Sequence, residues 1–229
     1  MFSKVFLALT NGEIKKQFPK KIAYMALHFS PYSTGLSNLP LDLPKNSILL
    51  LDDSTEPNNH DPQLVVEQLT QLANELLPVG VLLDFQRPVT EKLTAMADCI
   101  VKALPCPVGV TESYARDLDC PVFLSPLLAN KALADYIEPW KKQGVYLEIA
   151  PEGLEITVTQ TGSSTIPIFP VEGLPLEDHR LHCHYQVEVS SEKAVFTICR
   201  YKEDLVQLVQ EAEDLGILGC IGLYGELAI

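Results

Sequence analysis

The sequence predicts an α/β protein whose parallel sheet closes into a TIM-like (β/α)8 barrel, irregular or incomplete in places. Short apolar runs rich in β-branched residues alternate with amphipathic helical segments, as in consecutive βαβ units. Several runs are apolar on both faces, which is typical of parallel strands covered on both sides. The length of 229 residues suits one barrel domain spanning residues 1–229. An open doubly wound parallel sheet is the alternative arrangement of the same units.

The predicted strands are apolar runs that each end in polar residues. They are 22–29, 47–53, 79–86, 107–112, 121–125, 145–149, 184–189 and 219–224. Residues 1–13 are predicted to add an extra N-terminal strand and hairpin. Because the carboxyl ends of parallel strands meet at one mouth of a barrel, the polar residues that end these runs are the candidates for a site.

Helices are predicted between many of these strands. Residues 61–77 begin with Asp61 as N-cap and Pro62 in the first turn, and residues 203–215 end before Gly216. Residues 90–104 and 127–142 complete the predicted helices. The pattern is irregular at 152–165, where a hairpin is expected with its turn at 151–153, and at 165–180, which reads as a long loop.

Composition excludes some classes of partner. Seventeen basic against thirty acidic residues give a net charge of −13, which repels the phosphates of nucleic acid and of anionic membranes. The sequence offers no signal-peptide core and no run long enough to span a bilayer, so a cytoplasmic location is expected. The six cysteines lack CxxC spacing, and buried free thiols are expected rather than disulfides or structural zinc. Nucleotide-binding and serine-nucleophile motifs are missing, and no cofactor is predicted.

Strand-terminal polar residues form the candidate site. Three carboxyl groups are the candidates for acid or base chemistry, since carboxylates that converge on one mouth raise one another's pKa. They are Asp84, Glu112 and Glu148. Candidate substrate-binding residues are His28, Tyr32, Asp53, Gln86, Tyr146, Tyr224 and Glu226. The alternative is that strand-terminal acids only accept hydrogen bonds from turn amides, particularly at Asp53, which precedes a polar loop.

One segment carries a resemblance to a known family. A helix that leads into Gly80-x-x-x-Asp84-Phe85-Gln86 resembles the fourth-strand signature DGxDxDxE of the family 18 chitinase-like glycoside hydrolase barrels. Val79 and Leu82 stand where that signature has aspartates, and Gln86 replaces the glutamate that serves as general acid. The resemblance implies a carbohydrate-active barrel with a saccharide ligand. It also implies that the barrel is catalytically degenerate, or that Glu112 or Glu148 supplies the acid.

Two further functions remain open. Gln86 favours a non-catalytic barrel that binds a small molecule or a protein through the same mouth, because glutamine cannot donate a proton to a leaving group. His182 and His184 have the spacing of metal ligands on one face of an extended chain, so a metal-dependent hydrolase with Asp84 or Asp53 as further ligands is the third hypothesis. The oligomeric state is not predicted.

Overall fold

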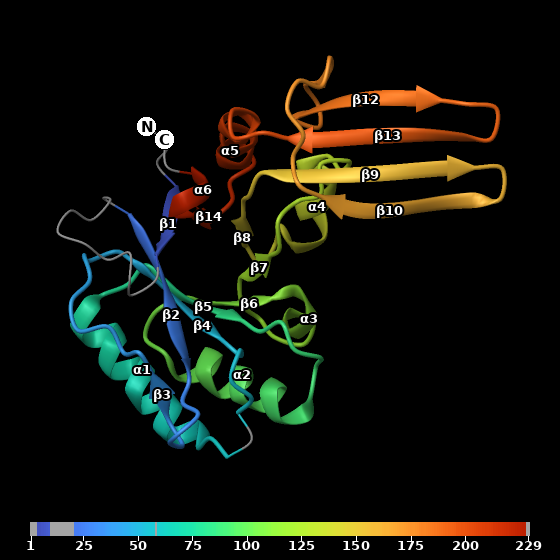
Figure 1. Cartoon of the computed structure of the whole chain (residues 1–229). Coiled ribbons are helices and arrows are strands. Elements are labelled where there is room, and N and C mark those ends of the chain that lie inside the picture. The colour runs from blue at the N-terminus through green and yellow to red at the C-terminus, as the bar shows by residue number, and fades with distance from the viewer. Residues whose placement is uncertain (1–3, 10–20, 58, 228–229) are drawn as a thin grey trace.

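The computed structural model describes residues 4–9, 21–57 and 59–227, and its main sheet is a closed barrel (Figure 1). Eight of the nine strands run parallel: β1 (Val5–Leu9), β2 (Ile22–Phe29), β4 (Ile48–Asp52), β5 (Gly80–Asp84), β6 (Val108–Thr111), β7 (Val122–Leu124), β8 (Val145–Glu148) and β14 (Gly219–Leu223). Strand β1 pairs with both β14 and β2, which closes the ring, and β3 (Leu36–Ser37) adds an antiparallel strand to β2. The predicted barrel is confirmed, and the open doubly wound sheet is excluded.

The helices are unequal in length. Three are long: α1 (Pro62–Leu76), α2 (Glu91–Ala103) and α5 (Asp204–Asp214). Four are short: α3 (Glu112–Ala115), α4 (Leu133–Ile137), the 3-10 helix η1 (Glu138–Trp140) and α6 (Tyr224–Leu227). As predicted, Asp61 caps α1 by accepting from the Gln63 amide at 3.0 Å, and Gly216 follows α5 with a φ of 83°.

The predicted helix 127–142 is wrong, because only α4 and η1 form within it. The segment before α4 serves another contact: the carbonyl of Leu127 accepts a hydrogen bond from the buried guanidinium of Arg200. This contact ties the start of the predicted helix to the arm, and residues 127–132 form an irregular segment with a turn before α4 begins.

The barrel has two apolar layers. Alternate residues of the strands fill its interior, among them Leu50, Leu82, Phe123 and Ile221, while the remaining strand residues pack against the surrounding helices. Gly109 faces the interior, where a Cβ atom would lie 2.7 Å from Cδ2 of Leu82. Since side chains alternate along a strand, the residue two positions after each interior residue faces the mouth.

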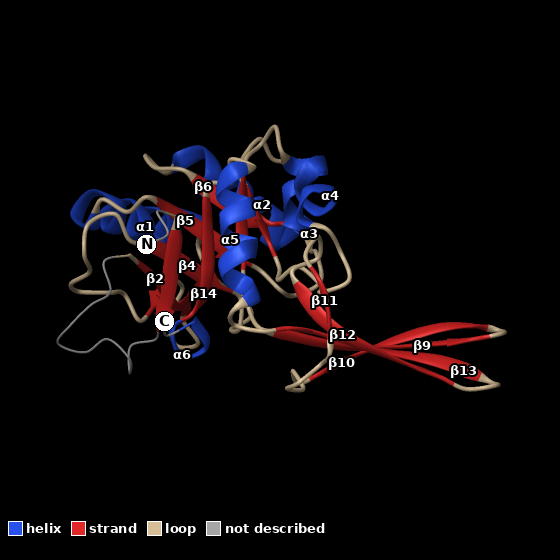
Figure 2. Cartoon of the chain, turned by 90° about the horizontal axis from the view of Figure 1, so that it is seen from above, coloured by secondary structure: helices blue, strands red, loops and turns tan. Residues whose placement is uncertain are grey.

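A second sheet projects from the barrel (Figures 1 and 2). It contains β9 (Glu152–Thr159), β10 (Gly162–Ile168), β11 (Leu176–Asp178), β12 (Cys183–Val189) and β13 (Lys193–Arg200), paired antiparallel in the order β10-β9-β13-β12-β11. The chain enters it directly after β8 and leaves it directly before α5. We call residues 152–200 the arm.

The strand pairings correct four predictions, three in the arm and one in the barrel. The run 184–189 belongs to β12 and not to the barrel, whereas β1, predicted as an extra strand, is a barrel strand. Alternation of apolar and polar residues along 184–189 is typical of an antiparallel sheet. The hairpin does form, but its turn lies between Thr159 and Gly162 rather than at 151–153. The predicted loop 165–180 contains the end of β10 and all of β11. Residues 1–3 and 10–13 of the predicted N-terminal strand and hairpin lie outside the described residues.

Two expectations from composition concern the whole chain. Among the helices of the described residues, none combines the length and apolar character needed to cross a membrane. All six cysteines are unpaired; four are buried, Cys106 is half-buried and Cys99 is exposed. The expectation of free thiols is confirmed, and the expectation of burial holds for four of them.

Candidate functional site

Three carboxylates meet at the mouth of the barrel because the strand alternation places them there. Each acid stands two positions after a residue whose side chain fills the barrel interior. The pairs are Leu50 and Asp52, Leu82 and Asp84, and Tyr146 and Glu148. Asp52 and Asp84 are register partners on β4 and β5, and neighbouring strands lie about 4.8 Å apart. Asp52, Asp84 and Glu148 line one cavity of about 70 Å³, with apolar side chains of the barrel core among its other walls.

Asp84 is held by Gln86, which stands at the position of the acid in the resembled signature. The side-chain amide of Gln86 donates to Oδ1 of Asp84 at 2.5 Å. Burial raises the pKa of Asp84; the Gln86 hydrogen bond lowers it, and the charges of Asp52 and Asp53 raise it. The net direction is upward, so the carboxyl keeps its proton to a higher pH than an exposed aspartate does.

Glu148 has the larger perturbation. Burial is the main cause, and the charges of Asp84, Glu226 and Glu152 add to it, raising the pKa of Glu148 to about 7. At neutral pH this carboxyl therefore populates both its acid and its base form. A group with that property can donate or accept a proton in a reaction.

Glu152 is a buried acid that the sequence reasoning did not single out. Burial raises its pKa to about 7, although the Arg200 guanidinium, 3.4 Å from Oε2, acts in the opposite direction. Arg200 is 1% exposed, and its nitrogens also donate to the carbonyls of Leu127, Leu181 and His182. No local sequence signal announces this pair, because its members are separated by 48 positions.

His28 and Asp53 have different roles in the structure. His28 is the register partner of Asp52, so it extends the polar row across β2, β4 and β5. Asp53 is 2% exposed, and its two carboxylate oxygens accept from the backbone amides of Gln86 and Arg87, each at 3.0 Å. Asp53 therefore accepts hydrogen bonds from turn amides, as the alternative for strand-terminal acids expects. These bonds hold the loop after β5 in place.

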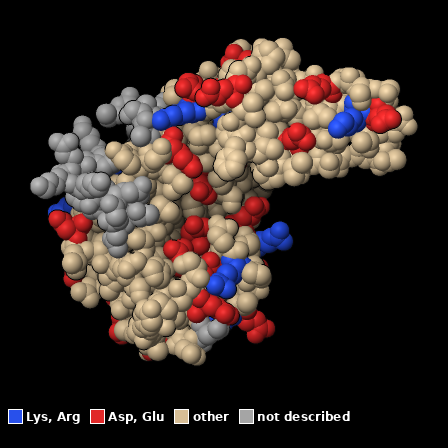
Figure 3. Space-filling model, viewed as in Figure 1, with Lys and Arg blue, Asp and Glu red and all other residues tan. Residues whose placement is uncertain are grey.

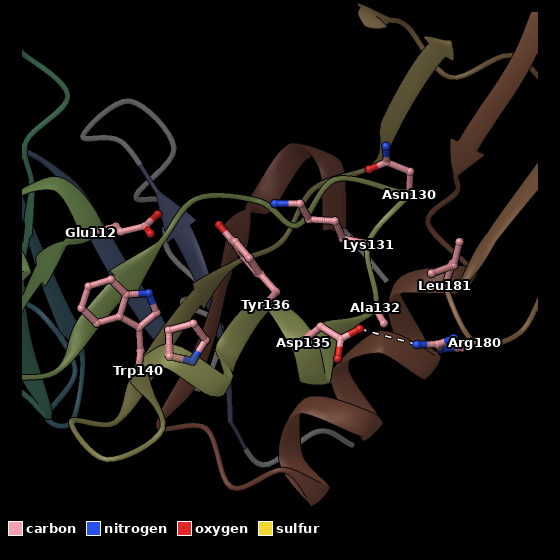
Figure 4. Close-up of a pocket in the computed structure, with 10 residues that line it drawn as sticks. Glu112, Asn130, Lys131, Ala132, Asp135, Tyr136, Trp140, Arg180 and Leu181 are labelled. Carbon is pink, nitrogen blue, oxygen red and sulfur yellow. Dashed lines mark ion pairs between the residues drawn. The ribbon is translucent and has the colours of Figure 1, made fainter. Parts of the chain in front are cut away.

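Glu112 faces a different cavity. It lies exposed at the start of α3 and lines a cavity of about 540 Å³ together with Tyr136 and Trp140 (Figure 4). Burial, followed by the charges of Glu112, Glu152 and Glu148, raises the pKa of Tyr136 to about 12. Glu112 is therefore not one of the carboxylates that line the small mouth cavity.

The remaining predicted binding residues are tyrosines and Glu226. Tyr32 is 96% exposed in the loop after β2, and Tyr224 and Glu226 lie on α6 beside the end of β14. Tyr146 is corrected: it is 3% exposed inside the barrel, with its hydroxyl near Gly80 at the start of β5. Its side chain fills the barrel interior below the mouth, so it does not face a ligand there.

The histidines do not form the arrangement that the metal-dependent hydrolase needs. Nε2 of His182 lies 2.5 Å from Glu211, whereas Nδ1 of His184 lies 3.2 Å from Asp204. His182 has a φ of 49° and precedes β12, so the two imidazoles do not share one face of a strand. Among the residues that the structure describes, no group of three or more His, Cys, Asp or Glu has the geometry to hold a metal ion.

The charge at the mouth is strongly acidic. In Figure 3, acidic side chains gather down the middle of the visible face. The cavity of Asp52, Asp84 and Glu148 has no lysine or arginine among its lining residues. Such a site disfavours anions and favours cations and neutral polar ligands that donate hydrogen bonds.

Comparison with known proteins places the fold. No family model matches the chain, and no curated protein matches it. Among solved structures, it is similar to the spore cortex-lytic enzyme SleL of Bacillus megaterium QM B1551, with a TM-score of 0.55, 9% identity and coverage of 96% of this chain and 70% of that one. It is also similar to the class V chitinase from Nicotiana tobaccum, with a TM-score of 0.54, 12% identity and coverage of 97% of this chain and 93% of that one. For a chitinase-like agglutinin from Robinia pseudoacacia the TM-score is 0.52 and the identity 11%, with coverage of 94% of this chain and 93% of that one.

These similarities concern the fold. The chain has a barrel of the same architecture as SleL and the class V chitinase. At identities of 9–12% the likeness is one of fold, and fold alone does not fix an activity.

Proposed function

We propose that this chain is a carbohydrate-active barrel that binds a saccharide at the mouth formed by Asp52, Asp84 and Glu148. The observation that carries the proposal is the meeting of these carboxylates in one cavity at the carboxyl end of the barrel. Carboxylates accept hydrogen bonds from sugar hydroxyls, and a site without cationic side chains repels anionic ligands but not a neutral saccharide. The names of the structural neighbours point to chitin-like saccharides as the first class to test.

Hydrolysis at this mouth requires a proton donor. Glu148 fits that role, because its pKa of about 7 leaves a protonated fraction at neutral pH. Asp84 would then act as the second carboxyl group, either activating water or stabilising the positive charge that develops on the sugar ring. In this proposal the acid has moved from the position of Gln86, two residues after β5, to the end of β8.

A non-catalytic saccharide-binding barrel is the second candidate, and Gln86 is the specific observation in its favour. Gln86 stands at the position of the acid in the resembled signature and already donates to Asp84. That hydrogen bond stabilises the ionised form of Asp84 without supplying any proton to a substrate. Both candidates require a saccharide at the mouth, and they differ only in turnover.

The first experiment is a thermal-shift panel on the purified chain with mono- and oligosaccharides, including oligomers of N-acetylglucosamine. A ligand that binds only the folded state raises the melting temperature. Asp84→Ala is expected to abolish a saccharide-dependent rise. Glu67→Ala is the control, since Glu67 is exposed on α1, outside the residues that line the mouth cavity. No rise with any saccharide would contradict the proposal.

Turnover is tested separately on any saccharide that binds. Hydrolysis that is lost in Glu148→Gln while binding remains would support Glu148 as the acid. Binding without hydrolysis in the wild-type chain would favour the non-catalytic candidate. In that case Gln86→Glu, which restores the acid of the resembled signature, is the variant in which to look for a gain of activity.

A further inference from the structure

A cavity of about 540 Å³ lies where the arm joins the barrel (Figure 4). One wall comes from the segment before α4, from α4 and from η1, and the other comes from Arg180 and Leu181 of the arm. Its lining residues differ from those of the small cavity that Asp52, Asp84 and Glu148 line. Small-molecule sites have volumes of about 300–1,000 Å³, so this cavity has the size of a ligand site in its own right.

Hydrogen bonds hold both walls of this cavity in place. The buried guanidinium of Arg200 donates to the carbonyl of Leu181 at 2.8 Å in the arm, and to the carbonyl of Leu127 at 2.5 Å ahead of α4. On α4, the hydroxyl of Tyr136 donates to the carbonyl of Ser125 at 3.1 Å. The cavity is therefore formed by the folded chain itself, as small-molecule sites usually are.

Part of the cavity surface is apolar. Tyr136 and Trp140 line one side and Leu181 the other (Figure 4). Trp140 is half-buried, so part of its ring is open to a ligand. An apolar group of a ligand that packs against these side chains would leave water, which favours binding.

The cavity is also lined by four charged side chains, of which two pair with one another. They are Glu112, Lys131, Asp135 and Arg180. The guanidinium of Arg180 lies 3.5 Å from Oδ2 of Asp135, so these two charges compensate each other. Within the described part of the chain, neither Lys131 nor Glu112 has an ion-pair partner. Figure 4 shows both side chains directed toward the hydroxyl end of Tyr136, and Nζ of Lys131 lies 5.5 Å from the centre of that ring. One ammonium and one carboxylate are thus left for a ligand.

We propose that this cavity binds a small zwitterion, a free amino acid or a short peptide, whose carboxylate lies on Lys131 and whose ammonium lies on Glu112. Hydrogen bonds between an ammonium and a carboxylate are stronger than those between neutral groups. An uncharged ligand would use neither charge, and a ligand of one sign would be repelled by one of the two. A side chain on the ligand would pack against Tyr136 and Trp140. The inference does not depend on the saccharide function.

Trp140 gives a direct readout, because it is the one tryptophan of the chain. Its fluorescence is followed while the full chain is titrated with leucyl-alanine from about 10 µM to about 20 mM, a range that covers weak small-ligand affinities. A saturable change is expected. Acetylation of the amino group, or amidation of the carboxyl group, removes one charge from the dipeptide. Each is expected to raise the dissociation constant at least about tenfold.

Two substitutions assign the two charges. In Lys131→Met the free dipeptide and its amidated form should bind equally, because the group that contacts the carboxylate is gone. In Glu112→Gln the free dipeptide and its acetylated form should bind equally. Lys102→Met on α2 and Glu67→Gln on α1 are matched controls outside the cavity, and should change each dissociation constant by less than about twofold. All four side chains are exposed, so these variants should fold, which circular dichroism checks.

Three results would overturn the proposal. The first is the lack of any saturable change in fluorescence with leucyl-alanine up to about 20 mM. The second is equally tight binding of the dipeptide blocked at both ends, or of the dimer of N-acetylglucosamine, because the cavity would then recognise apolar surface or hydroxyl groups rather than two charges. The third is discrimination between the free and blocked dipeptides that persists in both Lys131→Met and Glu112→Gln.

Discussion

Replacing Glu148 by glutamine should make the protein more stable at alkaline pH. The folded chain holds this carboxyl with a pKa of about 7, against an ordinary value near 4.5. As pH rises from about 4.5 to about 7, the unfolded chain releases a proton that the folded chain retains, so stability falls over that window. Glutamine resembles the protonated acid in size and polarity and carries no charge at any pH.

The magnitude follows from the shift in pKa. The difference between a pKa of about 7 and the ordinary value of 4.5 corresponds to about 3 kcal/mol at full effect. Glu148 is only partly buried, and screening by solvent reduces the figure, so we expect Glu148→Gln to gain about 2 kcal/mol at pH 8. At pH 5, where the folded wild-type carboxyl is protonated, the variant and wild type should differ by less than about 0.5 kcal/mol.

Urea unfolding at pH 5 and pH 8, followed by circular dichroism, measures both differences. Glu67→Gln is the matched control and should show no gain at either pH, because Glu67 is exposed on α1. Glu152, whose pKa is also raised to about 7, leaves a residual pH dependence in every variant. An equal effect of Glu148→Gln at both pH values, or a loss of stability at pH 8, would refute the reasoning.

Three further substitutions test the packing that positions the mouth. Arg200→Met should lower the free energy of unfolding by about 3–5 kcal/mol in urea at pH 8, because it leaves the Glu152 carboxylate buried without its partner. The destabilisation should be smaller at pH 5, and an equal destabilisation at the two pH values would contradict the pairing. Asp61→Ala should cost about 1 kcal/mol through loss of the cap of α1, and an unchanged urea midpoint would argue against it. Gly109→Ala should cost about 1–3 kcal/mol, since its Cβ would lie 2.7 Å from Leu82; a neutral effect on the melting temperature would show that the interior accommodates a methyl group.

The barrel was predictable because its information is local. Strands that are apolar on both faces, and the start of the helix capped by Asp61, are each recognised from a few neighbouring residues. Strand β1 is short, which makes it look like an addition to the barrel. The run 184–189 is wrongly assigned to the barrel, although its alternation of apolar and polar residues is typical of an antiparallel sheet. The arm depends on register between distant strands, such as Gly153 with Cys199, which one sequence does not display.

The site was predictable only in part. Asp84 and Glu148 were found because acids that end barrel strands converge at one mouth, whereas Tyr146 faces the interior one step below it. Glu112 occupies a separate cavity, and Asp53 is consumed by backbone amides. Glu152 was missed because its burial depends on Arg200, a contact made by the fold rather than by the local sequence.

The most direct test of the central claim is an NMR titration of the isotope-labelled chain with the saccharide that gives the largest thermal shift. A saccharide bound at the mouth should give chemical-shift changes concentrated at the ends of β4, β5 and β8, around Asp52, Asp84 and Glu148, and these changes should be lost in Asp84→Ala. Shift changes confined to the cavity of Tyr136 and Trp140, or no changes at all, would contradict a saccharide site at the barrel mouth.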